Sequence, residues 1–422
     1  MAALNRMKAV SLVMVGDEIL DGRTLETNSA YLIERLRRRR ARVASIRIVP
    51  DRHEAIVRAL SAAHSESVAV VVSGGLGPTP DDRTREALAA FVDEELVLDE
   101  ELAENLRQRY HQRNRPMPQS NLRQAMRTTH GRPIENPRGT APGLLHLCEG
   151  IPIILLPGVP AELKSMWEAT AESIVLPLVE NAAPRALRLR STGLPESKAA
   201  DLAKGVQLDP SLVELSFCVT RFGVDLLLTS RQESVDLPGI AQPLLEVLGE
   251  YVFTIGDRGL DEVVSEMLAE RGETVAVAES CTGGLLGAAL SESPGSSRSF
   301  LGGIVAYSNQ VKEAQLGVSP QLLAEHGAVS EEVARAMARE VRELLGSSWA
   351  LSITGIAGPE GDTSDKPVGT VHIALEGAEY SESRLLHLPG DRAQNRQWSV
   401  AAALELLRRA MSHPRPRDPS VR

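Results

Sequence analysis

Apolar and polar positions follow two different periods along residues 8–170. Short apolar runs such as VAVVVS at 68–73 are separated by segments whose apolar residues recur every three or four positions, such as HEAIVRALSAAH at 53–64. Buried strands joined by amphipathic helices produce this alternation. It predicts a parallel sheet covered on both faces by helices. The further expected strands are 8–16, 43–50 and 151–158, and the further expected helices are 29–40 and 84–92.

The pattern changes after residue 185. Up to residue 255 it predicts the order strand, helix, strand, strand, helix, strand, which is typical of a ferredoxin-like module. No catalytic constellation is evident in this segment, so we interpret it as a structural connector or a dimerisation module. The expected strands are 186–193, 213–222, 224–231 and 252–255, and the expected helices are 195–206 and 240–251.

A third pattern, again of the α/β type and with a mixed sheet expected, begins at residue 256. Its expected helices are 261–272, 285–293, 331–346 and 393–411, and its expected strands are 274–280, 349–355, 369–375 and 383–388. We therefore predict an α/β multidomain protein: a Rossmann-like three-layer domain (1–175), a small α+β connector (176–255), an α/β domain (256–412) and a disordered, proline- and charge-rich tail (413–422).

Composition narrows the functional class. The net charge of −10 over 422 residues argues against a general nucleic-acid binder. The arginine run at 35–40 ends an expected helix, where cations suit the helix dipole, and we interpret it as a solvated helix end. Three cysteines without a CxxC motif predict neither a disulfide framework nor a zinc site. No stretch approaches the roughly 18 apolar residues of a membrane span, so we expect a soluble, cytoplasmic protein.

The segment AESCTGG at 278–284 is the first candidate for chemistry. A strand, a turn and a helix in succession leave backbone N–H groups free at the helix start, where they can bind an anion or an oxyanion. Gly283 and Gly284 permit close approach of a ligand. The alternative interpretation is that Ser280 and Thr282 only cap the helix.

Three other stretches also follow expected strands, so one cleft could gather all four. They contain Tyr307–Ser308–Asn309 with Lys312, a glycine-proline loop after 349–355, and Asp391–Arg392 at the start of the last helix. A serine nucleophile needs a base. No histidine lies in these motifs, so the candidate is Lys312, one of only six lysines among 46 basic residues. Its pKa would have to fall from about 10.4 by some 3 units for it to act near neutral pH. Cys281 is the rival nucleophile, and the residues alone leave that choice open.

The motifs AESCTGG, LGGIVAYSNQVK, HGAVSEEVARAMA, TGIAGPEG, KPVGTVHIAL and GDR, in this order over 256–410, resemble the C-terminal domain of the CinA family. That domain is similar to nicotinamide-nucleotide amidase, which hydrolyses nicotinamide mononucleotide to nicotinic acid mononucleotide and ammonia. The resemblance implies Ser280 as nucleophile, Tyr307 and Lys312 as activating partners, Arg392 near the phosphate, and no cofactor. Glu279 could face the pyridinium or be a solvated acid at a strand end. The substrate-binding residues that it implies are Glu279, Cys281, Thr282, Gly283, Gly284, Ser308, Asn309, Thr354, Gly355, Gly358 and Arg392.

A second constellation lies near the N-terminus. SGGLGPTPDD at 73–82 is a glycine-rich loop after a strand, and its N–H groups can cradle phosphate. The paired acids Asp81 and Asp82, with Asp17 and Glu18, could hold a divalent cation that bridges to that phosphate. Helix capping is the alternative role for Asp81, Asp82 and Asn28, with the helix expected to begin near Asp82.

Together with VMVGDEILDG, ETNSAYL, NLRQAM, NPRGTAPG and ILLPGVPAEL, this loop resembles the N-terminal domain of the same family, which is related to molybdopterin-binding proteins. The family usually has threonine where this chain has Ser73. The resemblance implies a metal-dependent ADP-ribose pyrophosphatase that uses a divalent ion, with or without a monovalent one. The alternatives are a non-catalytic pterin- or nucleotide-binding module and a competence-linked interaction protein. We expect a homodimer with small nucleotide ligands and no membrane or nucleic-acid partner. The implied nucleotide- and phosphate-binding residues are Gly16, Asn28, Ser73, Gly74, Gly75, Gly77, Thr79, Asn121, Gln124, Gly139, Thr140 and Gly158.

Overall fold

The computed structural model describes residues 7–112, 114 and 116–412. The chain divides into two compact units, Met1–Pro184 and Arg185–Arg422. The tail predicted to be disordered, 413–422, lies outside the described residues.

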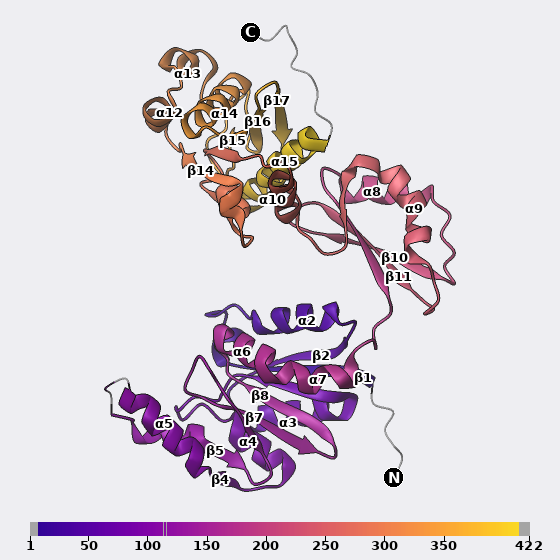
Figure 1. The fold of residues 1–422 in the computed structure, drawn as a ribbon, viewed down its shortest axis with the longest axis vertical. Coiled ribbons are helices and arrows are strands. Elements are labelled where there is room, and N and C mark those ends of the chain that lie inside the picture. Colours follow the sequence, from indigo (N-terminus) through magenta and orange to yellow (C-terminus); the bar gives the residue numbers. More distant parts are fainter. Residues whose placement is uncertain (1–6, 113, 115, 413–422) are drawn as a thin grey trace. The chain divides into compact units, whose positions relative to one another are not determined.

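The first unit is built on a six-stranded sheet with the order β2-β1-β3-β8-β7-β6 (Figure 1). The first four strands in this order are parallel to one another, β7 is antiparallel to β8, and β6 is antiparallel to β7. The predicted all-parallel sheet is therefore wrong at one edge. Its cause is the two-residue turn Glu149–Gly150 between β7 and β8: both residues have positive φ (50° and 81°), a geometry that joins antiparallel strands.

The elements of this unit, including several short ones that the sequence pattern did not predict, are β1 (Met7–Val15), α1 (Asp17–Leu20), α2 (Asn28–Arg38), β2 (Arg42–Val49), α3 (His53–Glu66), β3 (Ser67–Ser73), α4 (Thr84–Val92), β4 (Leu96–Leu98), α5 (Glu100–Gln112), the 3-10 helix η1 (Gln119–Ala125), β5 (Met126–Thr128), β6 (Arg132–Ile134), β7 (Gly143–Cys148), β8 (Ile151–Leu156), α6 (Pro160–Met166), the π-helical turn η2 (Trp167–Ala171) and α7 (Glu172–Val179).

Two apolar layers hold the sheet between helices. Alternate residues of β1 point to opposite faces: Leu12 packs in a core with α2, α6 and α7, and Val13 packs in a core with α3 and α4. This is the predicted three-layer α/β/α arrangement, and Figure 1 shows α2, α6 and α7 along one side of the sheet. The arginine run ends α2 as predicted, and Arg35 and Arg38 pair with nearby glutamates.

The second unit begins with the predicted ferredoxin-like module. Its four strands form an antiparallel sheet in the order β10-β11-β9-β12, and one face of this sheet is covered by α8 and α9. The elements are β9 (Ala186–Ser191), α8 (Glu196–Lys204), β10 (Val213–Val219), β11 (Val224–Ser230), α9 (Leu237–Leu248), the 3-10 helix η3 (Gly249–Tyr251) and β12 (Val252–Ile255).

The rest of this unit is the predicted α/β domain with a mixed sheet. The strand order is β14-β13-β15-β16-β17; β13 is parallel to β14 and β15, β16 is antiparallel to β15, and β17 is antiparallel to β16. Helices α10, α11 and α15 cover one face, and α12, α13 and α14 cover the other. The elements are α10 (Leu260–Arg271), β13 (Val275–Glu279), α11 (Leu285–Ser291), the 3-10 helix η4 (Ser296–Arg298), β14 (Phe300–Val305), α12 (Asn309–Leu316), α13 (Pro320–His326), α14 (Glu331–Leu345), β15 (Trp349–Gly355), β16 (Thr370–Glu376), β17 (Ser381–His387) and α15 (Arg392–Ser412).

None of the helices within the described ranges is both long and apolar enough to cross a bilayer.

Candidate functional site

A buried serine–lysine pair lies at the carboxyl edge of the C-terminal sheet. Ser280 follows β13 directly, and Lys312 lies in the first turn of α12, the helix after β14. The ammonium nitrogen Nζ of Lys312 is 3.1 Å from Ser280 Oγ and donates to the carbonyl of Ala306 at 2.8 Å. Ser280 is 8% exposed and Lys312 is 1% exposed. The structure therefore brings together the two side chains that were predicted as nucleophile and base.

Glu279 caps the helix that follows the serine. Its carboxylate accepts the N–H groups of Gly284 and Leu286 at 3.0 and 3.1 Å, and that of Gly287 at 2.8 Å. The residue is 1% exposed, so its interpretation as a solvated acid is wrong. The capping role considered for Ser280 is wrong as well, because Glu279 occupies the helix start. These three N–H groups are consequently engaged and do not point to an open oxyanion site.

A second side chain also holds the turn between β13 and α11. Arg396 of α15 donates through Nε and Nη2 to the carbonyl of Thr282, at 3.2 and 2.6 Å. Gly283 and Gly284 have φ of 59° and 97°, which glycine adopts without strain. The Thr282 hydroxyl is buried and has no hydrogen-bond partner among the described residues, so it does not cap α11. Sequence reasoning missed Arg396, although it lies one helical turn after Arg392 and thus on the same face of α15.

Burial acts in opposite directions on the two titratable neighbours of Ser280. Desolvation lowers the pKa of Lys312, because the charged ammonium is disfavoured away from water. Desolvation raises the pKa of the Cys281 thiol to about 11. Both pKa shifts are in the direction that favours the uncharged form of the side chain.

A more open part of the site lies beside the serine–lysine pair. Tyr307 is 59% exposed, and its hydroxyl accepts a hydrogen bond of 2.8 Å from Arg392 at the start of α15. Arg392 also donates to the carbonyl of Gly358 at 2.6 Å. The Tyr307 hydroxyl is thus paired with Arg392 rather than with Ser280 or Lys312.

The other predicted residues of this site have more local contacts. Ser308 caps α12 by accepting from Val311, and the exposed Asn309 is the first residue of that helix. Thr354 donates to the carbonyl of Ala328 at 2.7 Å, and Gly355 ends β15. Ser280 N–H donates to the carbonyl of Ile353, which ties the serine to the same strand.

The N-terminal glycine loop leaves the carboxyl end of β3 in the first unit. Gly74 and Gly75 have φ of 107° and 65°, and a Cβ at Gly74 would lie 2.1 Å from the carbonyl oxygen of Val15. Asn28 donates to Ser73 Oγ at 3.0 Å and to the Gly158 carbonyl at 2.8 Å. Its role as a helix cap is therefore wrong, and it instead links the ends of β3 and β8.

Asp82 organises this loop instead of capping a helix. Its carboxylate accepts from the N–H groups of Gly77 and Thr79, each at 2.8 Å. Helix α4 begins at Thr84, with Arg83 as its N-cap and no side-chain cap bond. The predicted helix start near Asp82 was thus two residues early, and this carboxylate is committed to the loop.

The predicted metal ligands do not form a dedicated cage. Within residues 7–112, 114 and 116–412, no group of three or more His, Cys, Asp or Glu side chains is arranged to hold a metal ion. Asp51 after β2, which sequence reasoning missed although it also follows a strand, accepts from the Asp17 N–H at 2.8 Å. Burial chiefly raises the pKa of Asp51, and the negative charges of Glu18, Asp17 and Asp81 raise it further. A Mg²⁺ ion needs only one or two carboxylates plus substrate phosphates, and this acidic edge fits that donor set.

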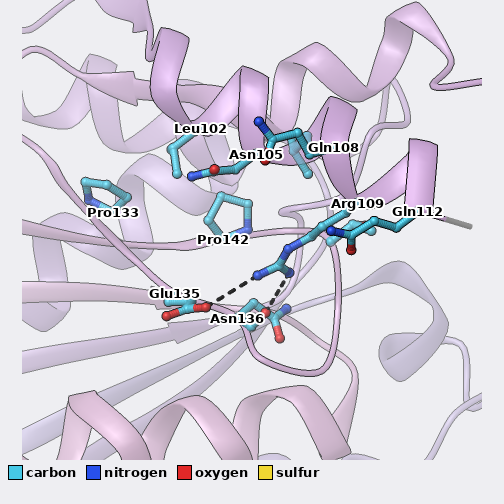
Figure 2. Close-up of a pocket in the computed structure, with 11 residues that line it drawn as sticks. Leu102, Asn105, Gln108, Arg109, Gln112, Pro133, Glu135, Asn136 and Pro142 are labelled. Atoms are coloured by element: carbon cyan, nitrogen blue, oxygen red, sulfur yellow. Dashed lines mark hydrogen bonds and ion pairs between the residues drawn. The ribbon is translucent and has the colours of Figure 1, made fainter.

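The remaining predicted residues lie in several other segments of the first unit. Gly16 donates to the carbonyl of Val49 at 3.1 Å. Asn121 and Gln124 are buried in η1, and Oε1 of Gln124 has no partner in the described part of the chain. Gly139 accepts from Arg109 through its carbonyl, and Thr140 lines a pocket of about 470 Å³ next to α5 (Figure 2).

These features define a protein with two α/β domains, each with polar side chains gathered at the carboxyl edge of its sheet, and a ferredoxin-like module between them in sequence. Residues 257–411 match the CinA C-terminal domain family, and residues 11–178 match a family described as a probable molybdopterin binding domain.

Full-length relatives identify the family. A CinA-like protein of Geobacter sp. (strain M21) is 42% identical over 405 residues, which cover 94% of this chain and 96% of the relative. A CinA-like protein of Thermotoga maritima is 36% identical over 405 residues, which cover 96% and 98%. A crystal structure titled as CinA with unknown function, from Thermoplasma acidophilum, is 37% identical; the match covers 40% of this chain and 98% of that one, with a TM-score of 0.38. The chain belongs to the CinA family.

Proposed function

We propose that the C-terminal domain is an amidase that hydrolyses the carboxamide of nicotinamide mononucleotide through a serine nucleophile. The observation that carries the proposal is the 3.1 Å contact between Lys312 Nζ and Ser280 Oγ in a buried setting. A nucleophile within hydrogen-bond reach of a base is the arrangement that covalent acyl transfer needs. The raised pKa of Cys281 supports serine over cysteine as nucleophile, since a thiol is reactive only as the thiolate.

In the proposed reaction, Ser280 Oγ bonds to the carboxamide carbon while neutral Lys312 takes the hydroxyl proton. The carbonyl oxygen becomes an oxyanion, which N–H groups at the turn stabilise. The N–H groups of Cys281 and Thr282 suit this role, because Glu279 occupies those at the helix start. The C–N bond then breaks, the departing nitrogen takes the proton from Lys312, and ammonia leaves. Water attacks the acyl-enzyme with Lys312 again as base, which releases nicotinic acid mononucleotide and restores Ser280.

Arg392 is the proposed ligand of the substrate phosphate. Guanidinium groups bind phosphate through paired N–H donors, and this one lies on the exposed side of the site, held by Gly358 and Tyr307. This contact supports Tyr307 as a residue that orients Arg392.

The test is ammonia release from nicotinamide mononucleotide by the full chain and by Ser280→Ala, Lys312→Met and the matched neighbour Cys281→Ala. We expect wild type and Cys281→Ala to turn over, while the other two are folded and inactive. An inactive Cys281→Ala beside an active Ser280→Ala would assign the nucleophile to the cysteine. A wild type that releases no ammonia would remove the amidase proposal.

For the N-terminal domain we propose phosphate binding by the loop from Ser73 to Asp82, with metal-dependent cleavage of ADP-ribose to AMP and ribose 5-phosphate as its activity. The support is the loop that Asp82 holds in place beside the acidic edge of Asp17, Glu18 and Asp81. A bound divalent ion would neutralise the phosphates there.

The test is AMP formation from ADP-ribose with Mg²⁺ and with EDTA, for wild type, Asp81→Asn and the control Asp93→Asn. We expect Mg²⁺-dependent cleavage that Asp81→Asn alone reduces. Binding of ADP-ribose without cleavage would favour the non-catalytic nucleotide- or pterin-binding module. Salt-sensitive DNA binding without either would favour the competence-linked interaction protein.

A further inference from the structure

Asn395 of α15 links two loops at the exposed end of the C-terminal site. The residue is fully buried. Its Nδ2 donates to the carbonyls of Ala357 and Gly390, at 3.2 and 2.8 Å, and its Oδ1 accepts the N–H of Gly390 at 3.0 Å. Ala357 lies in the loop after β15, and Gly390 lies in the turn before α15. One buried amide thus joins two segments that β16 and β17 separate in the sequence.

The two loops carry the proposed phosphate ligand and the groups that orient it. The exposed Arg392 begins α15, and its Nη1 donates to the carbonyl of Gly358, the residue after Ala357. Its Nη2 donates to the hydroxyl of Tyr307. These contacts use one N–H of each terminal nitrogen, and the others remain for a phosphate. An exposed arginine loses rotamer freedom when it binds a ligand, so an anchored one binds at a lower entropic cost.

Other side chains hold the nucleophile end of the site. Arg396, the next residue of α15, donates to the carbonyl of Thr282, and Glu279 accepts the N–H groups at the start of α11. The turn that carries Ser280 therefore depends on these two side chains, whereas the bonds of the Asn395 amide go to the loops at the phosphate end. Adjacent residues of one helix support opposite ends of the site, so their effects can be separated.

We infer that Asn395 is a positioning residue that fixes Arg392 for the substrate phosphate and so makes the amidase select the mononucleotide over its nucleoside, nicotinamide riboside. The inference rests on the proposed amidase function and phosphate contact, and it adds the residue through which that contact becomes selective. A guanidinium held in one orientation can pair two N–H groups with a phosphate. The nucleoside carries no phosphate, so its binding is independent of how Arg392 is held.

The experiment measures the steady-state kinetics of ammonia release by the full chain from the mononucleotide and from the riboside, together with thermal unfolding. Asn395→Ala removes all three bonds, and Asn395→Asp keeps the acceptor for Gly390 but turns an oxygen towards both carbonyls. The matched control is Ser399→Ala, because this buried hydroxyl donates at 2.7 Å to the Asn395 backbone carbonyl, a bond within α15.

We expect both Asn395 variants to raise KM for the mononucleotide about tenfold or more, the size of effect expected from losing a hydrogen bond to a charged group. KM for the riboside and kcat for both substrates should stay within about twofold of wild type. Ser399→Ala should keep the wild-type preference even where its unfolding midpoint falls. In an Arg392→Ala background, Asn395→Asp should not raise KM further, because Asn395 acts through Arg392.

An unchanged preference in folded Asn395 variants, or equal losses of kcat on both substrates, would overturn the inference. If neither Asn395 variant folds, Arg392→Lys decides. This exposed substitution keeps the charge but not the paired hold on Gly358 and Tyr307, so it should lose most of the preference, and an unchanged preference would overturn the inference.

The wild type separates this inference from the proposals on which it rests. If wild type releases ammonia from neither substrate, the amidase proposal fails and the inference fails with it. If wild type turns over both substrates with equal kcat/KM, the amidase stands, whereas the phosphate contact of Arg392 and the role of Asn395 fail. If wild type prefers the mononucleotide and the Asn395 variants do so equally, only the inference fails.

Discussion

Replacing Glu279 by glutamine tests whether this buried acid holds the nucleophile turn or contacts the substrate. The carboxylate accepts three N–H groups at 2.8–3.1 Å and is 1% exposed. A glutamine keeps one acceptor oxygen, which can retain the bonds from Gly284 and Leu286. Its amide NH₂ then faces the N–H of Gly287.

The magnitude follows from these contacts. One hydrogen bond to a charged group is lost, worth about 1.5–3 kcal/mol. The interaction of the negative charge with the helix start, worth up to about 2 kcal/mol in buried settings, is lost as well. We therefore expect Glu279→Gln to lower the free energy of unfolding by about 1.5–5 kcal/mol. At about 2–4 °C per kcal/mol, the unfolding midpoint falls by roughly 3–20 °C.

The assay is thermal unfolding together with the steady-state kinetics of ammonia release from nicotinamide mononucleotide. We expect kcat to fall about tenfold or more because the turn that carries Ser280 loosens, while KM changes little because the carboxylate does not reach the substrate. The matched control is Glu262→Gln at the start of α10. Glu262 accepts a single N–H bond, from Gly259, which the glutamine oxygen can keep, so kcat should be unchanged. An unchanged unfolding midpoint together with a raised KM would refute this reasoning. It would instead favour a contact between Glu279 and the pyridinium of the substrate.

Three further outcomes follow from the two sites. Burial lowers the pKa of Lys312 below its usual 10.5, so kcat/KM should rise with pH through that lowered pKa. Between the lowered pKa and pH 10.5 the unfolded chain binds more protons than the folded chain, so the free energy of unfolding should rise with pH over that range. Lys312→Met should flatten both pH profiles. Arg396→Ala should lower kcat with little change in KM, whereas Arg392→Ala should mainly raise KM, and the same effect from both variants would contradict the separate roles. Asp82→Asn should weaken ADP-ribose binding and lower the free energy of unfolding by about 1–3 kcal/mol, because one of the two loop N–H groups loses its acceptor. Unchanged titration and unfolding curves would contradict the role of Asp82 in holding the loop.

Element type was predictable for many of the long segments with a single period, although the 13-residue helix α5 was missed. The apolar run of β3 and the helical repeat of α3 lie where their patterns indicated. The segments β4, β5 and β6 escaped prediction because they are three residues each, too short to show a period. The antiparallel direction of β7 depends on the backbone angles of the Glu149–Gly150 turn, which the strand pattern itself does not encode.

The candidate site was predictable to the extent that chain order determines geometry. Ser280 and Lys312 each follow a strand of one sheet, so their meeting at its carboxyl edge could be anticipated. The direction of the Glu279 side chain could not be anticipated. An acid at the end of an apolar strand is expected to be solvated unless the position of the neighbouring helix is known. The same holds for Asp82, whose partners Gly77 and Thr79 precede it in a loop without periodicity.

The electrostatics of the C-terminal site fit the proposed roles of a serine nucleophile and a lysine base. Removal from water favours the neutral form of every titratable group. For a lysine the neutral form is the base, so the lowered pKa of Lys312 supports its proposed role as proton acceptor; an arginine there would stay charged. For a cysteine the neutral form is the unreactive thiol, so the same burial disfavours the reactive thiolate of Cys281. A serine hydroxyl carries no charge to lose and needs only a base within reach, which Lys312 provides at 3.1 Å. The same desolvation therefore supports Ser280 and Lys312 as the proposed reacting pair and disfavours the Cys281 thiolate.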